Sequence, residues 1–244
     1  MRWVTDRTGR FARRPHYDPT EIDQECERIV CDFLLKTHKK VEFPITTSDL
    51  TILIESHVED LDQGADLTEE EGEVEGLTEF TRGKKPTVRI SSGLIGKPNI
   101  ENRLRTTLTH EFSHVIFHTF MFEVDSKPRS LFETTSELPL QLTHKCKRDN
   151  MLESSITDWM EWQAGYGCGA FLMPITSLAR TVKDFRQAYS MPIGSLSLLS
   201  DEGQELIQTV SGAFQISKDA ARVRLLQKRF LQDNAGHMVG NLFN

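Results

Sequence analysis

Two histidines and a glutamate lie close together near the middle of the chain, in the segment His110-Glu-Phe-Ser-His114. Residues four apart on an α-helix lie on the same face, one turn from each other, so both imidazoles would point the same way. Two neutral imidazoles placed in this way can bind one Zn²⁺ and leave room for a third protein ligand and a water molecule. The H-E-x-x-H spacing therefore predicts a zinc site on a helix.

The glutamate between the histidines has its own chemical role. A zinc ion in such a site lowers the pKa of a bound water molecule to about 7 and polarises the carbonyl that the water attacks. Glu111 follows the first ligand directly, so it would lie beside the metal and could take a proton from the water. His118 lies about 12 Å from His110 along a helix, too far to share the ion, and we expect it to pack behind the ligands.

The residues around the motif favour a buried, unbroken helix. Apolar residues flank the histidines, and neither Pro nor Gly occurs from Arg103 to His118. A solvated surface helix would not carry apolar side chains at this spacing. The two imidazoles are therefore predicted to project from a rigid element.

A third metal ligand must come from another part of the chain. The metzincin extension of the motif needs Gly at position 117 and His at position 120, and both positions hold Phe, which excludes that class. Glu161 is the best candidate, because it lies inside an apolar, aromatic run that begins at Trp159, after the possible caps Thr157 and Asp158. A carboxylate in a buried helix is costly unless it is paired or bound to a metal. A solvated or salt-bridged carboxylate is the alternative. The downstream candidates are His144, Cys146, Glu153, Asp158, Glu161 and Cys168.

Two segments after the motif carry further spaced residues. In the first, Glu161-x-x-Ala164 is followed by Phe171-Leu-Met-Pro174, and the second runs from Phe214-Gln-Ile-Ser to Ala-Arg-Val-Arg-Leu225. They resemble the Glu-x-x-Ala-Asn-x-Phe-Ala-x-x-Leu-Leu-Met-Pro and Phe-x-Val-Ser-x-x-Ala-x-x-x-Arg-Leu signatures of the ImmA/IrrE family, gluzincin-like H-E-x-x-H zinc metallo-endopeptidases. The chain departs from the first signature at Gly165, where the family has Asn, and at Gly167-Cys168, where it has Phe-Ala.

The resemblance covers about residues 100–230 and implies both an activity and a substrate. It implies that His110, His114 and Glu161 bind Zn²⁺ and that Glu111 is the catalytic carboxylate of an endopeptidase. It also implies that the substrate is a protein, a helix-turn-helix transcriptional repressor of a mobile element or a stress regulon. Mn²⁺ as the metal in the cell stays open, because ligand type alone does not decide occupancy.

Substrate-binding residues are predicted by analogy with other H-E-x-x-H enzymes, in which a sheet edge beside the motif helix holds the substrate as an added strand. A strand is predicted at Pro86–Ser91, just before the motif helix, so we expect Val88 and Ile90 to contact an extended peptide. Tyr166 and His144 are candidates for stabilising the oxyanion.

Composition sets the limits on class and compartment. The chain has 244 residues, of which 38% are hydrophobic and 27% charged, enough for one large domain or one with a small satellite. No apolar run approaches the roughly 18 residues that span a bilayer, and the basic N-terminus lacks the apolar core of a signal peptide. The four cysteines form no C-x-x-C pair and fit reduced thiols. We therefore expect a cytoplasmic protein without membrane contact.

The fold class predicted is α+β and predominantly helical: a zincin-like metallopeptidase core with a small β-sheet and a C-terminal helix-turn-helix-like hairpin. The predicted divisions are an extended basic arm at 1–18, a zinc metallopeptidase domain at 19–195 and a helical segment at 196–244 packed on it. An acidic run from Glu55 to Glu79 is predicted to be mostly a mobile loop. Strands are predicted at Val41–Ile45, Leu50–Glu55, Gly76–Thr81 and Pro86–Ser91.

The last third of the chain supports a rival hypothesis. Two apolar helix faces meet at the N-cap residue Ser217, as in a helix-turn-helix. A DNA-binding protein would use the cations of the second helix on phosphates, through residues 201–230. The chain would then be a transcriptional regulator or protein-binding module that keeps the zinc fold. The net charge of −7 favours structural packing or substrate docking over nucleic-acid contact. The cations in question are Lys218, Arg222, Arg224, Lys228 and Arg229.

Overall fold

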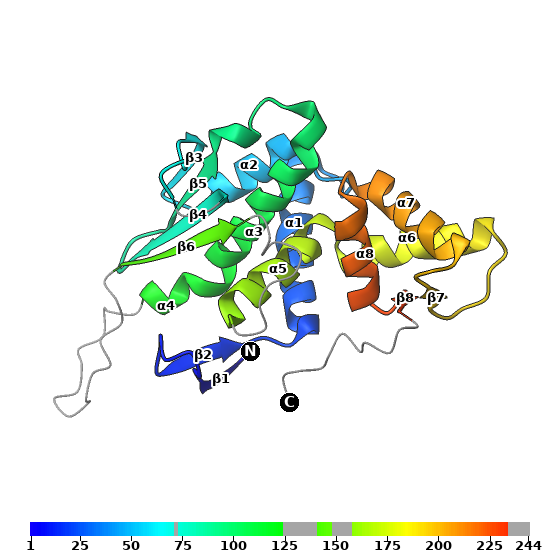
Figure 1. The fold of residues 1–244 in the computed structure, drawn as a ribbon, viewed down its shortest axis with the longest axis horizontal. Coiled ribbons are helices and arrows are strands. Elements are labelled where there is room, and N and C mark those ends of the chain that lie inside the picture. The colour runs from blue at the N-terminus through cyan, green and yellow to red at the C-terminus, as the bar shows by residue number, and fades with distance from the viewer. Residues whose placement is uncertain (71–72, 124–140, 148–157, 234–244) are drawn as a thin grey trace.

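The computed structural model describes residues 1–70, 73–123, 141–147 and 158–233 of the chain (Figure 1). These residues form an α+β structure that is mostly helical, which confirms the predicted class at this level. The helices are α1 (Pro19–His38), α2 (Thr47–Glu55), α3 (Glu101–His118), α4 (Phe120–Glu123), α5 (Trp159–Leu172), α6 (Ile175–Ala188), α7 (Asp201–Phe214) and α8 (Lys218–Gln227). The strands are β1 (Arg2–Thr5), β2 (Arg13–His16), β3 (Asp60–Ala65), β4 (Val74–Thr81), β5 (Thr87–Ser91), β6 (Gln141–Lys147), β7 (Leu196–Ser197) and β8 (Leu231–Gln232).

Helices α3 and α5 pack against each other at the centre of the molecule, with α1 beside α5 (Figure 1). The motif helix α3 is buried on almost all sides, and Leu108 and Phe112 belong to the main hydrophobic core. Helix α5 begins at the predicted cap, where the Asp158 carboxylate accepts bonds from the backbone N–H groups of Met160 and Glu161. The sequence around the motif thus forms the rigid helix that its composition predicts.

A four-stranded sheet lies beside α3, in the order β3-β5-β4-β6. Strand β5 pairs parallel with β3 and antiparallel with β4, and β6 pairs antiparallel with β4. The predicted strands at 76–81 and 86–91 are confirmed, together with the hairpin that joins them. Since β5 lies inside the sheet, both of its edges are already hydrogen-bonded.

Two strand predictions in the first third of the chain are wrong, and a third prediction holds only in part. Val41–Ile45 is not a strand, and Leu50–Glu55 lies in helix α2. The Thr46 hydroxyl caps this helix by accepting a bond from the backbone N–H of Asp49 at 3.0 Å, and the buried residues follow a helical period. The acidic run is not a loop throughout either, because Asp60–Ala65 forms β3 and pairs with β5.

The two ends of the described chain also differ in detail from their predictions. Within the segment expected to be an extended arm, β1 and β2 form an antiparallel hairpin. The hairpin is held to the body of the protein by the ion pair between Arg10 and Asp158, at 2.6 Å. At the other end, α7 and α8 form the predicted helical hairpin with Ser217 as the N-cap of α8, and both helices share the main core with α1, α3 and α5. In the part of the chain that the structure describes, no helix combines the length and apolar character needed to span a bilayer.

Candidate metal centre

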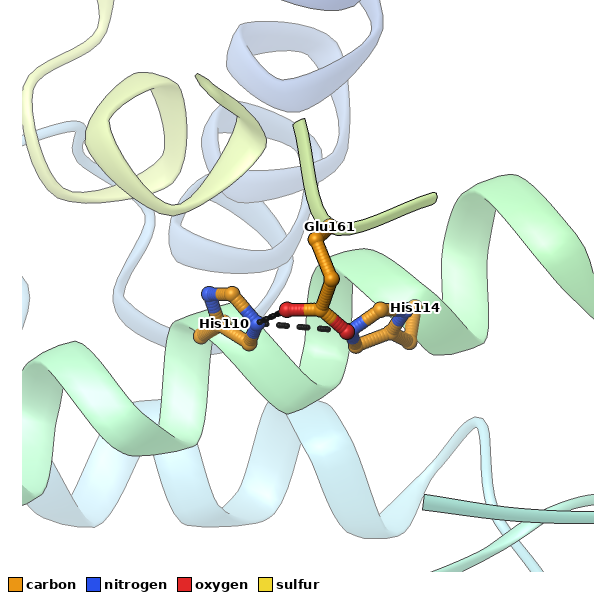
Figure 2. A group of neighbouring side chains, drawn as sticks. All are labelled: His110, His114 and Glu161. Carbon is orange, nitrogen blue, oxygen red and sulfur yellow. Dashed lines mark hydrogen bonds and ion pairs between the residues drawn. The ribbon is translucent and has the colours of Figure 1, made fainter. Parts of the chain in front are cut away.

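Three buried side chains converge between α3 and α5 (Figure 2). The imidazoles of His110 and His114 extend from consecutive turns of α3 toward the carboxylate of Glu161, in the first turn of α5. The His110 Nε2 and Glu161 Oε2 atoms are 3.2 Å apart, the His114 Nε2 and Glu161 Oε1 atoms are 3.3 Å apart, and the two Nε2 atoms are 3.3 Å apart. We call these three residues the metal cluster.

The spacing of the metal cluster fits a zinc ion. In a tetrahedral zinc site with bonds of about 2.0–2.1 Å, neighbouring donor atoms lie about 3.3 Å from one another. The three separations in the metal cluster agree with one face of such a tetrahedron. Two imidazoles and one carboxylate are also a donor set that catalytic zinc sites use. Residues His110, His114 and Glu161 could therefore hold a metal ion.

Burial and charge act in opposite directions on the first histidine. His110 is fully buried, which disfavours its charged form, but the adjacent Glu161 carboxylate outweighs this effect and raises the pKa of the imidazole. The carboxylate thus stabilises positive charge at this position. A proton and a metal cation would compete for the same nitrogen, because a histidine binds a metal ion only in its neutral form.

A chain of polar contacts fixes the orientation of the second histidine. The Nδ1 atoms of His114 and His118 lie 3.1 Å apart, and His118 Nε2 lies 3.0 Å from Gln163 Oε1. The Gln163 amide then donates to the backbone oxygen of Pro15 at 3.0 Å. His118 therefore packs behind the ligands, as its spacing predicts, and Gln163 is a supporting residue that the sequence analysis missed. Such contacts set the tautomer and the ring position of a metal-binding histidine.

The Glu111 carboxylate contacts strand β4. Its carboxylate is fully buried, and Oε2 accepts a hydrogen bond from the Thr78 hydroxyl at 2.5 Å. Gly76 lies so close that a Cβ atom there would be 2.6 Å from Glu111 Oε1. Glycine is therefore required at this point of β4. Neither Gly76 nor Thr78 was predicted to belong to the site, although a glycine at the start of a predicted strand signals close approach of the backbone to another group.

The prediction that Val88 and Ile90 contact a substrate is wrong. Both side chains are fully buried in the main core, and β5 is bonded to β3 and β4 on its two sides. An added strand cannot pair with it. In the part of the chain described, β6 pairs with β4 alone, so β6 and not β5 is the edge on this side of the sheet.

The two oxyanion candidates have different outcomes. The prediction that Tyr166 stabilises the oxyanion is wrong, because its hydroxyl donates to the Asp23 carboxylate of α1 at 3.0 Å. His144 lies in β6, where its backbone stands opposite Thr78, and its side chain falls outside what the structure describes.

Of the remaining ligand candidates, the two whose side chains the structure describes do not join the metal cluster. Asp158 caps α5, and the Cys168 thiol lies 3.2 Å from the Thr109 hydroxyl. Glu153 lies outside the described residues, as does the side chain of Cys146. Cys26, Cys31 and Cys168 are free thiols, in agreement with the reduced state predicted for them.

The cations of the C-terminal hairpin are partly used inside the protein. Arg224 and Lys228 both pair with Asp23, at 2.6 and 2.5 Å, and Arg224 is only 1% exposed. Arg222 pairs with Asp219 at 3.7 Å. Two of the five cations assigned to DNA contact are therefore occupied by a buried carboxylate, which weakens that hypothesis.

No protein-family model matches the chain, and no curated protein matches it. The resemblance to the ImmA/IrrE family therefore rests on the motif at 110–114 and on the segments at 161–174 and 214–225.

Proposed function

We propose that this protein is a zinc-dependent endopeptidase of the ImmA/IrrE type with a zincin-like core. The observation that carries the proposal is the convergence of His110, His114 and Glu161 at separations of 3.2 and 3.3 Å, with Glu111 beside them. Three buried donors and a separate buried carboxylate are the parts that hydrolysis at a zinc site needs. A structural zinc site would use four protein ligands and would not need the carboxylate.

Each residue of the site has a distinct task in this proposal. His110, His114 and Glu161 would hold the zinc, which when bound supplies a water molecule of lowered pKa and a positive charge for the carbonyl oxygen. Glu111 accepts the proton of the attacking water and passes it to the nitrogen of the leaving amine. The Thr78 hydroxyl fixes the Glu111 carboxylate, and Gly76 leaves the space that this carboxylate occupies.

The sheet suggests how a substrate would lie. Strand β4 contacts Glu111, and β6 lies next to β4 at the edge of the sheet that the structure describes. An extended peptide that pairs with this edge would pass next to the site. Such pairing uses backbone groups and suits a segment with little side-chain specificity. The family resemblance points to a helix-turn-helix repressor as the protein that carries the segment.

Metal content tests the ligand set. Elemental analysis of wild-type protein, purified without added metal, should give about one zinc per chain, and Glu161→Ala should hold far less because it lacks a ligand. Glu205→Ala makes the same change on the exposed face of α7 and should retain the wild-type amount. Equal zinc in both variants would show that Glu161 is not a ligand. Zinc in none of them would favour the binding-module hypothesis.

Peptide cleavage tests the catalytic carboxylate. Wild-type protein and Glu111→Gln are incubated with a peptide library, and new termini are identified by mass spectrometry. The wild type should generate new termini, whereas Glu111→Gln should keep its zinc and lose about 10²–10⁴-fold in rate, the usual contribution of general acid–base catalysis. A zinc-loaded wild type that cleaves no peptide and no purified helix-turn-helix repressor would refute the proposal. So would equal cleavage by the variant.

A further inference from the structure

A second buried group of charges lies on another side of α5. The Asp23 carboxylate of α1 accepts bonds from Arg224 Nη2 at 2.6 Å, from Lys228 Nζ at 2.5 Å and from the Tyr166 hydroxyl at 3.0 Å. We call Asp23, Tyr166, Arg224 and Lys228 the basic cluster. Among the described residues, Asp23 is the only carboxylate that pairs with either cation. The basic cluster therefore holds two positive charges against one negative charge.

The guanidinium of Arg224 is not fully satisfied by these contacts. Its Nη2 atom also donates to the backbone oxygen of Met173 at 3.3 Å, but Nε and Nη1 are buried and have no hydrogen-bond partner among the described residues. A guanidinium has five N–H donors and no acceptor, and a buried donor without a partner is costly. Arg224 therefore offers two N–H-bearing atoms to an acceptor from outside the protein.

A small cavity adjoins this guanidinium. Its volume is about 50 Å³, and it lies between α3, α5 and α8. A single water molecule needs roughly 10–15 Å³ of such space, so the cavity can take several waters or one compact anion. Its lining includes Thr106, Tyr166, Cys168, Gly169, Arg224 and Gln227. None of these side chains carries a negative charge that would repel an anion, since burial raises the pKa of both the Cys168 thiol and the Tyr166 phenol.

We propose that this cavity binds a small oxyanion, a phosphate or a carboxylate group, with Arg224 as its anchor. The anion would accept charge-assisted hydrogen bonds from Nε and Nη1 and would balance the extra positive charge of the basic cluster. The Gln227 amide lies one turn along α8 from Arg224 and can donate a further bond. Because the cavity is also lined by α3 and α5, the anion would connect α8 to the two helices that carry the metal cluster.

Calorimetric titration with inorganic phosphate tests the site, with acetate as a parallel probe for carboxylates. The full chain is first treated with a chelator, so that no metal ion binds the probe, and ionic strength is held constant with chloride. Gln227→Glu places a carboxylate beside Arg224 and should weaken phosphate binding on the order of tenfold or more, while raising the Tm of the anion-free protein. Gln208→Glu makes the same change on the exposed face of α7 and should bind phosphate like the wild type.

Thiol alkylation locates the bound anion. Cys168 lines the cavity, whereas Cys26 is also buried but does not line it. Phosphate should slow the alkylation of Cys168 more than that of Cys26, as measured by peptide mass mapping. A response to acetate with the same dependence on Gln227 would identify a carboxylate as the ligand, and a response to phosphate alone would identify a phosphate. No response to either probe, or equal affinity in Gln227→Glu and Gln208→Glu, would show that the cavity holds only water and would overturn the proposal.

Discussion

Helix α5 contributes one residue to each of two polar clusters, Glu161 to the metal cluster and Tyr166 to the basic cluster. The first has an excess of hydrogen-bond acceptors, and the second has an excess of donors. In the metal cluster, Glu161 meets two imidazoles, so lone pairs converge on one point. In the basic cluster, Tyr166 and the carboxylate of Asp23 meet two cations, so N–H donors are in excess. The metal cluster and the Asp23–Arg224 pair are shielded from water, and an unbalanced polar group is most costly in such a buried position.

The contrast shows how a buried imbalance indicates a class of ligand. Converging lone pairs are stabilised by a cation, and the separations in the metal cluster fit zinc. Excess N–H donors beside a cavity are stabilised by an anion. The two clusters should also respond differently to substitution. Changes in the metal cluster and its supports should affect catalysis, whereas changes in the basic cluster should affect folding.

The largest effect on stability is expected for Asp23→Asn. The substitution keeps the shape of the side chain but leaves Arg224 and Lys228 without a carboxylate, and a buried charge that loses its partner costs about 3–5 kcal/mol. Urea unfolding should show a decrease of this size in the free energy of unfolding. Zinc content should not change, because Asp23 does not touch the metal ligands.

Asp32→Asn is the matched control on the same helix. Asp32 pairs with Arg28 at 3.2 Å, but its side chain is 69% exposed, and a pair of this kind contributes about 0–1 kcal/mol. If the two variants lost equal amounts of stability, the basic cluster would not support the fold and the comparison between the clusters would fail.

Gly76→Ala should give the next largest effect, this time on catalysis. A Cβ atom at this position would lie 2.6 Å from Glu111 Oε1 and 2.8 Å from its Cγ, so the carboxylate must move. A misplacement of this order can reduce the rate about 10²-fold. Peptidase assays and zinc analysis should show lower kcat with unchanged metal content.

Gly212→Ala provides the control for the glycine substitution. Nothing lies within 4 Å of a Cβ atom at position 212 in α7, so this change should leave activity intact and, as Ala for Gly in a helix, should add up to about 1 kcal/mol of stability. Full activity in Gly76→Ala would show that Glu111 does not need its present position.

The metal cluster could be predicted from the sequence because its signals are local. His110 and His114 are one helical turn apart, and Glu161 follows a cap at the start of an apolar run. The basic cluster could not be predicted, because the pairing of Asp23 with Arg224 joins residues 201 positions apart. No pattern of neighbouring residues marks such a pair.

The errors in the fold have comparable causes. Leu50–Glu55 was assigned to a strand from its apolar and β-branched residues, although Thr46 and Asp49 form a helix start just before it. Strand β3 could not be predicted because Asp60–Ala65 is polar and acidic. Its partner, β5, lies in a separate part of the sequence, so no local pattern indicates the pairing. The interior position of Val88 and Ile90 in the sheet could not be predicted, because the sequence of one strand does not indicate which strands flank it.

The smallest and most specific effect is expected at Thr78. Thr78→Val replaces the hydroxyl that donates to Glu111 with a methyl group of similar size, and loss of one hydrogen bond to a carboxylate should lower kcat/KM about tenfold. Thr78→Ser keeps the hydroxyl but removes a buried methyl group, which should cost about 1 kcal/mol of stability while activity stays near that of the wild type. Activity should therefore follow the hydroxyl and not the free energy of unfolding. If the serine variant lost as much activity as the valine variant at equal zinc content, Thr78 would serve packing alone, and the orientation of Glu111 would have to come from another contact.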